Sequence, residues 1–471
     1  MLFNSYTFAL FFIVVFILFW LPVRKRRREW QNIVILVASY VFYGWWDWRF
    51  LFLIALTSLT SWLSGMLISR NVRPRIVSAA NIIINIGILA CFKYFNFFID
   101  SFISLFSLFG INMGSGTLDI ILPVGISFYT FQALSYSIDV YRGRIRACSD
   151  PVRFFAFVSF FPALVAGPIE RAQNLLPQFD LPKDKLDYDK AIVGVFRVVY
   201  GLFLKIVIAD RLAVYVNGAW GHLDTLSWFP AVVAMVFFAF QLYLDFSAYS
   251  EIAKGIAALL GFEVMTNFRR PYLSATFKEF WKRWHISLSS WFMDYVYIPL
   301  GGSRRGEPRR WVNLMTVFLL SGLWHGASWN FVLWGALNGI FVLSLDPLLR
   351  RMRHLGPLVV FICWTASLVL FRSPGNVETS GFLSGLFTSG EIHSVFTYGL
   401  GKSELLFAAC LVAALVVWEH IAERYGERLK KKIVSGPSIV RYVLLTMVIL
   451  LIIIFGRYGI GNDSAFIYFQ F

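Results

Sequence analysis

The stretch Ser321-Gly-Leu-Trp-His-Gly-Ala-Ser-Trp-Asn330 places a single histidine, His325, inside a strongly apolar part of the chain. Residues 311–320 before it and 331–345 after it contain no acidic or basic side chain, and the next charged residue is Asp346. An ionisable group in such a segment is costly to keep in a membrane, so it is a candidate functional group. With no counter-ion nearby in the sequence, His325 is predicted to be a neutral imidazole that can accept a proton.

The composition around this stretch is that of a membrane protein. Hydrophobic residues make up 58% of the 471 residues and charged residues 15%, and the mean hydropathy is +0.66, so a soluble globule would expose large apolar patches. Apolar runs that cross or nearly cross a ~30 Å hydrocarbon core recur along the chain. They cover residues 8–21, 50–68, 76–91, 121–138, 191–208, 229–246, 312–323, 358–370, 405–417 and 443–455.

These runs predict an all-α, polytopic integral membrane protein with about ten to twelve transmembrane or re-entrant helices, forming one domain over residues 1–471. Glycine and proline interrupt several runs, which favours re-entrant helices that line a cavity. The run 191–208 contains Arg197 and Lys205 and is the weakest candidate span.

The net charge of +16 arises from 43 basic and 27 acidic residues, and its distribution argues against nucleic acid as a partner. Basic clusters stand in short loops beside apolar runs, at residues 24–28, 70–75, 142–146, 304–310 and 430–432. This positive-inside pattern predicts that these loops are cytoplasmic, that the first apolar segment is an uncleaved helix with its N-terminus outside, and that the partners include membrane lipids. The four cysteines lack paired spacing and no His/Cys cluster has metal-ligand spacing, so neither a structural disulfide nor a metal is expected.

Residues 267–303 mix basic with aromatic side chains and lack a full apolar span. Such a mixture is typical of the membrane interface, where rings lie at headgroup depth and basic groups reach phosphate or water. We therefore expect this segment to lie at the interface.

Several motifs extend from this segment across nearly the whole chain. They are Pro123-Val-Gly-Ile-Ser-Phe-Tyr-Thr-Phe-Gln132, Phe161-Pro-Ala-Leu-Val-Ala-Gly-Pro-Ile-Glu-Arg171, Tyr243-Leu-Asp-Phe-Ser-Ala-Tyr-Ser-Glu251, Trp281-Lys-Arg-Trp-His-Ile-Ser-Leu-Ser-Ser-Trp291, Asp294-Tyr295, Tyr297-Ile-Pro-Leu-Gly-Gly302, Leu323-Trp-His-Gly326 and Phe466-Ile-Tyr-Phe-Gln-Phe471. This set resembles the membrane-bound O-acyltransferases, and within them the bacterial alginate O-acetyltransferase branch. The signature core covers about residues 240–340. Met293 departs from the pattern, which has a basic residue before Asp-Tyr.

The resemblance implies acyl transfer from a thioester donor to a hydroxyl at the base of a central funnel, with His325 as the essential histidine and His285 as the second signature position. Acyl transfer needs a base for the hydroxyl proton, donors for the oxyanion and a site that excludes water. Further candidates for substrate binding or for orienting the ring are Asp245, Trp284, Ser321, Trp324, Ser328 and Asn330. On a continuous helix, Ser321 precedes His325 by one turn and Ser328 follows it by three residues. Asp245 is equally compatible with a salt bridge at a helix end.

The resemblance also implies acetyl-CoA as the donor substrate, with no bound cofactor. Its phosphates call for a basic, aromatic-rimmed mouth on the cytoplasmic side. The candidates are Lys282, Arg283, Arg304 and Arg305, for which contact with anionic lipid headgroups is the alternative.

Three functions stay open. The first is an acetyltransferase subunit of the bacterial inner membrane that moves acetyl toward an exported polysaccharide such as alginate or cellulose, together with a periplasmic acetyltransferase partner and the polysaccharide synthesis machinery. The second is an acyltransferase for peptidoglycan O-acetylation or carrier-linked D-alanyl transfer. The third, a transporter or scaffold, is disfavoured because neither paired repeats nor several intramembrane charges are evident.

Overall fold

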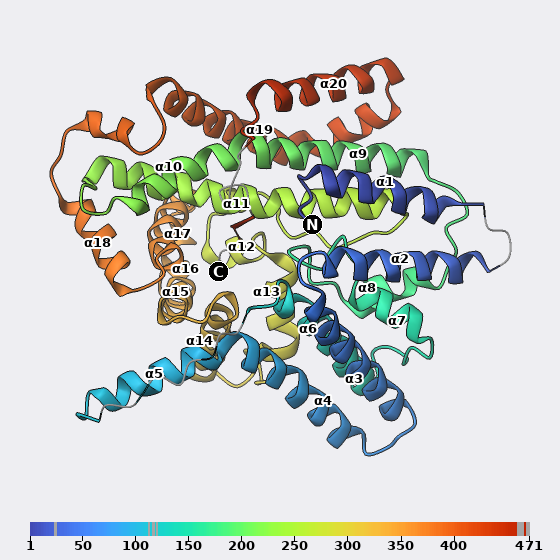
Figure 1. Ribbon diagram of the computed structural model, residues 1–471. Coiled ribbons are helices and arrows are strands. Elements are labelled where there is room, and N and C mark those ends of the chain that lie inside the picture. The colour runs from blue at the N-terminus through green and yellow to red at the C-terminus, as the bar shows by residue number, and fades with distance from the viewer. Residues whose placement is uncertain (23–25, 112–113, 115–117, 119–120, 459–465, 468–471) are drawn as a thin grey trace. The chain divides into compact units, whose positions relative to one another are not determined.

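The computed structural model describes residues 1–22, 26–111, 114, 118, 121–458 and 466–467 (Figure 1). In this part of the chain the regular structure is helical throughout, which confirms the all-α prediction. The chain divides into two units, one formed by Met1–Asp187 with Ala257–Met265 and the other by Tyr188–Ile256 with Thr266–Phe471. That the whole chain acts as a single domain stays a prediction.

The first unit contains helices that pack through small and polar side chains. Asn81 of α4 donates to Ser137 Oγ of α6 at 2.8 Å, and Gly65 of α3 leaves room for the Tyr136 ring. Such contacts let apolar helices approach closely. The elements are α1 (Tyr6–Trp20), α2 (Arg27–Gly44), η1 (Trp48–Phe50), α3 (Leu51–Ser69), α4 (Pro74–Leu89), η2 (Ala90–Tyr94), α5 (Phe95–Ser107), α6 (Ile126–Tyr141), α7 (Pro151–Val158), α8 (Ala172–Leu175) and η3 (Leu176–Phe179).

The second unit holds both signature histidines. Its elements are α9 (Tyr188–Leu202), η4 (Phe203–Ala209), α10 (Asp210–Gly221), α11 (Trp228–Leu259, which ends in the first unit), η5 (Pro271–Leu273), α12 (Phe277–Trp281), α13 (Ile286–Phe292), η6 (Met293–Tyr297), α14 (Glu307–His325), α15 (Trp329–Ile340), η7 (Phe341–Leu345), α16 (Asp346–Leu349), α17 (Gly356–Arg372), α18 (Asn376–Phe387), η8 (Ile392–Thr397), α19 (Lys402–Ser435) and α20 (Ser438–Phe455). The segments η4, η6 and η7 are π-helical turns, a form found in many functional sites.

Seven helices among the described residues are long and apolar enough to cross a membrane. They are Trp48–Ser69, Pro74–Ser107, Tyr188–Gly221, Trp228–Leu259, Trp329–Leu349, Lys402–Ser435 and Ser438–Phe455, and the shorter apolar helices are Tyr6–Trp20 and Gly356–Arg372. The protein is therefore a multi-pass membrane protein. The sequence predicted ten to twelve spanning or re-entrant segments. Fewer helices are long enough to cross the membrane, because several apolar runs form shorter helices.

The run 191–208 lies within a helix of spanning length despite its charges. Arg197 forms an ion pair with Glu251 of α11. Lys205 Nζ lies 2.8 Å from Asp210 Oδ1 and 2.6 Å from Asp245 Oδ1. Each cation is thus offset by carboxylates, which the desolvation cost of a charge in an apolar environment requires.

Residues 267–303 contribute aromatic rings to the core of the second unit. Phe277, Phe280 and Trp284 are buried, and the Trp284 ring packs 4.8 Å from that of Trp364 on α17. The rings of this segment fill the core of the unit, whereas Lys278 and Lys282 are exposed and Arg283 pairs with carboxylates. That the segment lies at the membrane interface stays a prediction.

The helices α14 and α15 approach each other at two glycines. A Cβ on Gly322 would lie 3.3 Å from the Gly335 Cα, and one on Gly335 would lie 3.3 Å from the Gly322 Cα. Both added carbons would also overlap backbone carbonyl oxygens of the facing helix. Only a residue without a side chain permits this contact, which fixes the C-terminal half of α14.

Candidate active site

His325 is the last residue of α14 and lies in an aromatic cage. Its ring centroid is 5.0 Å from that of Trp324, 5.2 Å from Trp334 of α15 and 5.3 Å from Phe371 of α17. The residue is 6% exposed. Three aromatic walls limit the space beside the imidazole and exclude bulk water, which is the environment that acyl transfer without hydrolysis requires.

His285 lies next to this cage on a different element. It is the residue before α13, is 1% exposed, and its ring centroid lies 6.3 Å from that of His325. Burial lowers the pKa of His285 to about 3, so its imidazole is neutral at any physiological pH. A neutral imidazole carries one N–H donor and one acceptor nitrogen. The structure thus brings together the two histidines that stand 40 positions apart in the sequence.

A cavity of about 640 Å³ extends along the same face of α14 as His325. The α14 residues that line it are Arg310, Leu314, Val317, Phe318 and Ser321. Their spacing of three and four residues places them on one side of the helix, and His325 continues the series one turn after Ser321. From Arg310 to His325 the helix rises about 22 Å, at about 1.5 Å per residue.

The opposite wall of the cavity comes from the segment around His285 and from the end of the α15 helix. It consists of Lys278, Trp281, Lys282, Ile286, Ser289, Ser290, Phe292, Met293, Tyr297, Ser303, Val342, Asp346, Pro347 and Arg350. The basic groups Lys278, Lys282 and Arg350 are exposed, whereas Ser321 is buried. The cavity therefore has a basic, solvent-accessible end and an inner end one helical turn from His325.

Asp346 holds the cavity wall together. Its two carboxylate oxygens accept hydrogen bonds from the backbone N–H groups of Phe277 and Lys278, at 2.7 and 3.0 Å. These amides belong to the first turn of α12, where backbone donors lack partners within the helix. The carboxylate thus caps α12 and positions the segment that carries Lys278 and Lys282.

The comparisons with known proteins show the family of the chain. Residues 144–362 match the model of the membrane-bound O-acyltransferase family. The chain is 36% identical over 438 residues to the probable alginate O-acetylase AlgI of Azotobacter vinelandii, covering 90% of this chain and 86% of that protein. The chain belongs to the membrane-bound O-acyltransferase family.

Two further relatives of this O-acyltransferase are named for other polymers. The chain is 34% identical over 370 residues to the peptidoglycan O-acetyltransferase of Helicobacter pylori, covering 72% of this chain and 69% of that protein. It is 26% identical over 229 residues to the teichoic acid D-alanyltransferase of Bacillus subtilis, covering 46% and 58%. The chain is an enzyme, an O-acyltransferase of the AlgI type.

The other candidate residues of this O-acyltransferase are spread around the cage. Trp324 contacts both histidines, with its ring 5.8 Å from that of His285. Ser321 lines the inner end of the cavity. Ser328 does not continue the helix of His325, because α14 ends at His325 and Gly326 is extended, with φ −162° and ψ 155°. Ser328 instead caps α15 by accepting from the Asn330 N–H at 3.2 Å.

Three candidates make contacts that stabilise the surroundings of the cage. Asn330 Nδ2 donates to the Ser373 carbonyl oxygen at 3.0 Å and to Thr379 Oγ1 at 3.1 Å, which ties α15 to the segment after α17. Asp245 pairs with Lys205. Trp284 packs among aromatic rings of the core.

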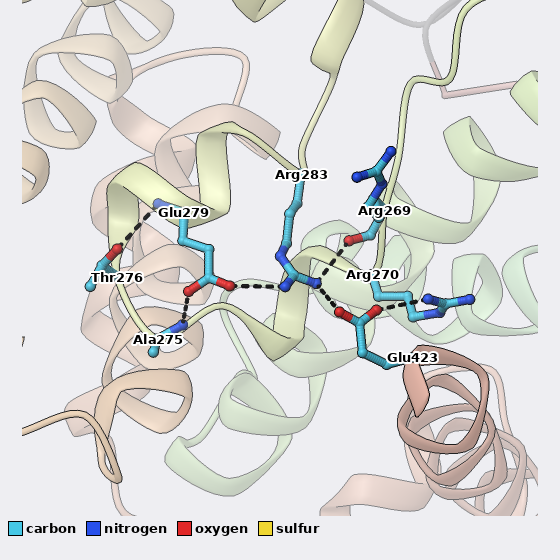
Figure 2. Close-up of polar contacts among 7 residues, drawn as sticks. All are labelled: Arg269, Arg270, Ala275, Thr276, Glu279, Arg283 and Glu423. Carbon is cyan, nitrogen blue, oxygen red and sulfur yellow. Dashed lines mark hydrogen bonds and ion pairs between the residues drawn. The ribbon is translucent and has the colours of Figure 1, made fainter. Parts of the chain in front are cut away.

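Of the four basic donor-site candidates, the structure places Lys282 on the cavity. Arg283 lies in a network with Glu279 and Glu423 of α19, at 2.9 and 3.0 Å, and Glu423 also binds Arg270 at 2.7 Å (Figure 2). Arg304 and Arg305 are exposed and are not among the residues that line the cavity.

Sequence reasoning did not single out Arg310, Lys278 or Arg350 as cavity residues, although Arg310 lies in the basic cluster 304–310 and Lys278 in the basic and aromatic segment 267–303. The signal for Arg310 was present, since it begins the three- and four-residue series that ends at His325. No comparable signal exists for Arg350, which reaches the cavity because the helix Trp329–Leu349 before it packs against α14.

Proposed function

We propose that this chain is a subunit of a bacterial inner-membrane system that transfers acetyl from acetyl-CoA toward hydroxyls of an exported polysaccharide such as alginate or cellulose. The observation that carries the proposal is the position of His325, at the end of the α14 face that lines the cavity. A thioester donor combines an anionic nucleotide with a slender arm. The basic, exposed end of the cavity fits the former, and its apolar part along Leu314, Val317 and Phe318 fits the latter.

In the proposed reaction His325 acts as general base. It takes the proton from the acceptor hydroxyl as the hydroxyl oxygen attacks the thioester carbonyl. The tetrahedral oxyanion collapses, the carbon–sulfur bond breaks, and the thiolate leaves with the proton returned by the imidazole. His285, neutral and close by, donates its N–H to the oxyanion or to the group that orients His325.

The acceptor is assigned from the relatives. Alginate O-acetylases match over most of this chain, whereas the D-alanyltransferase matches less than half of it. The peptidoglycan enzyme matches 72% and makes peptidoglycan the second candidate acceptor. We further propose a periplasmic partner that receives the acetyl group, since His325 lies within the membrane protein and the polymer lies outside the cell.

Donor binding tests the assignment of the cavity. Titration of purified protein with acetyl-CoA should show Lys282→Gln raising the Kd about 10-fold, the effect of losing about 1.4 kcal/mol from one charge-assisted phosphate contact. Arg304→Gln is the matched control, because Arg304 is a nearby basic residue that does not line the cavity. Equal effects of the two substitutions would place the phosphates elsewhere, and a wild-type protein that does not bind acetyl-CoA would point to a carrier-linked donor.

A further inference from the structure

His285 has a backbone conformation that is uncommon for a residue with a side chain. Its φ of 41° and ψ of 54° are left-handed, a region that few residues other than glycine adopt, asparagine, aspartate and histidine more often than the rest. The other non-glycine residues with positive φ in the described part of the chain are Arg26, Asn71, Arg73 and Arg270, none of which is buried. A strained backbone persists only where its surroundings hold it, so something must fix the chain at His285.

The start of α13 raises a second requirement. His285 occupies the N-cap position, and its side chain makes no capping hydrogen bond. The first backbone N–H groups of a helix have no partner within the helix and need one from outside, most of all in a buried segment. They include the amides of Ile286 and Ser287, the first two residues of α13.

Asn267, 18 residues earlier, meets this need. Its backbone carbonyl accepts the Ile286 N–H at 2.9 Å. Its side-chain Oδ1 accepts the Ser287 N–H at 3.3 Å and the Ser287 hydroxyl at 2.6 Å. Asn267 is 0% exposed, and its Nδ2 donates to Ser250 Oγ of α11 at 3.3 Å, so the capping residue is itself anchored.

We propose that Asn267 is a positioning residue for His285: it caps α13 from a distant segment in place of the N-cap side chain. A conventional cap at position 285 would use its side chain to accept the Ser287 or Leu288 N–H. Because Asn267 takes over that task, the imidazole at 285 faces His325, 6.3 Å away between ring centroids. Asn267 bonds to the backbone of Ile286, whose side chain lines the cavity, but Asn267 does not itself line the cavity, so it acts through the segment that it caps and through His285.

The assignment rests on the proposed function for its kinetic part, and hydrogen exchange tests it independently of activity. Amide exchange of the peptide that contains Ile286 and Ser287 is measured by mass spectrometry in wild type, Asn267→Ala, Asn267→Asp and Asn81→Ala. Asn81 is the matched control, a buried asparagine with a side-chain hydrogen bond in the first unit. Asn267→Ala should raise exchange at these two amides. Asn267→Asp keeps an acceptor oxygen and should restore protection, and Asn81→Ala should leave it unchanged.

Kinetics then separate positioning from general damage. Asn267→Ala should lower kcat for acetyl transfer about 100-fold, the effect of misplacing a reacting group by about 1 Å, with little change in the KM for acetyl-CoA. In a His285→Ala background the same substitution should cost no further activity, since the residue it positions is gone.

Two results would overturn the proposal. One is unchanged exchange at Ile286 and Ser287 in Asn267→Ala. The other is an equal loss of kcat from Asn267→Ala with and without His285, which would indicate a general structural role. If exchange rises but His285→Ala is fully active, the capping role of Asn267 stands and the chemical role proposed for His285 fails.

Discussion

Substituting Gly322 with alanine should separate α14 from α15 and displace His325. The added Cβ would lie 3.0 Å from the Phe331 carbonyl carbon, about 0.5 Å inside the ordinary carbon contact of about 3.5 Å, and it would overlap the carbonyl oxygen more severely. Both neighbours are backbone atoms and not a flexible side chain that can move aside, so the backbones of α14 and α15 must separate by about 1 Å. His325 stands three residues later on the same helix.

The expected magnitude follows from this displacement. Overpacking of a close contact costs about 1–3 kcal/mol of stability, and a shift of about 1 Å at a reacting group costs about 100-fold in rate. Thermal unfolding in detergent and acetyl transfer from labelled acetyl-CoA in membrane vesicles measure the two effects.

Gly87→Ala is the matched control, because Gly87 lies in α4 and nothing lies within 4 Å of an added Cβ there. It should leave the transfer rate unchanged and leave stability unchanged or slightly higher, since alanine favours a helix over glycine. A Gly322→Ala protein with wild-type melting temperature and transfer rate would refute the reasoning that this contact positions His325.

Three further predictions concern pH, acyl selectivity and topology. Burial lowers the pKa of His285 from 6.5 to about 3, so between these pH values the unfolded state binds a proton that the folded state does not. The free energy of unfolding therefore falls as the pH falls below about 6.5, with a slope of up to about 1.4 kcal/mol per pH unit. Melting temperatures from pH 7 to 5 should drop more steeply for wild type than for His285→Asn, and parallel curves would contradict the neutral, buried state. Trp334→Ala should open the cage beside His325 and raise kcat/KM for butyryl-CoA relative to acetyl-CoA, whereas an unchanged ratio would show that this wall does not limit acyl length. Cysteines placed beside Arg26 and Arg70 should resist a membrane-impermeant thiol reagent in intact cells, and ready labelling would reverse the assigned orientation.

The class of the protein was predictable from the sequence because it depends on composition. Apolar runs and basic loops require no knowledge of which helices meet. The pairing of charges does require that knowledge, and for this reason the run containing Arg197 and Lys205 was the weakest candidate span. Its carboxylate partners Glu251 and Asp245 come from another helix.

The central histidine was also predictable, since an ionisable group in an apolar segment stands out locally. Its relation to His285 was predictable only through resemblance to a known family, because the chain between them passes through the short elements α13 and η6 and a loop, which have weak local signals, before it enters α14. The interruption after His325 was missed. Gly326 ends α14, so Ser328 begins a new helix instead of continuing the old one.

The role of the basic residues illustrates a different limit. Lys282 and Arg283 are neighbours of the same charge, and no local pattern distinguishes them. In the folded protein Lys282 lines the cavity. Arg283 pairs with the carboxylates of Glu279 and Glu423 (Figure 2). Those partners include a residue of α19, 140 positions away in the sequence.

The most direct test of the central claim measures donor binding and acetyl transfer in the same His325→Gln protein. The claim predicts that His325→Gln binds acetyl-CoA with the wild-type Kd, because His325 lies beyond the residues that line the cavity. It also predicts that transfer of labelled acetyl to polymer in membrane vesicles falls about 100- to 10,000-fold, the range that a general base contributes. Transfer near the wild-type rate by a His325→Gln protein that is correctly inserted would contradict the assignment of His325 as the base.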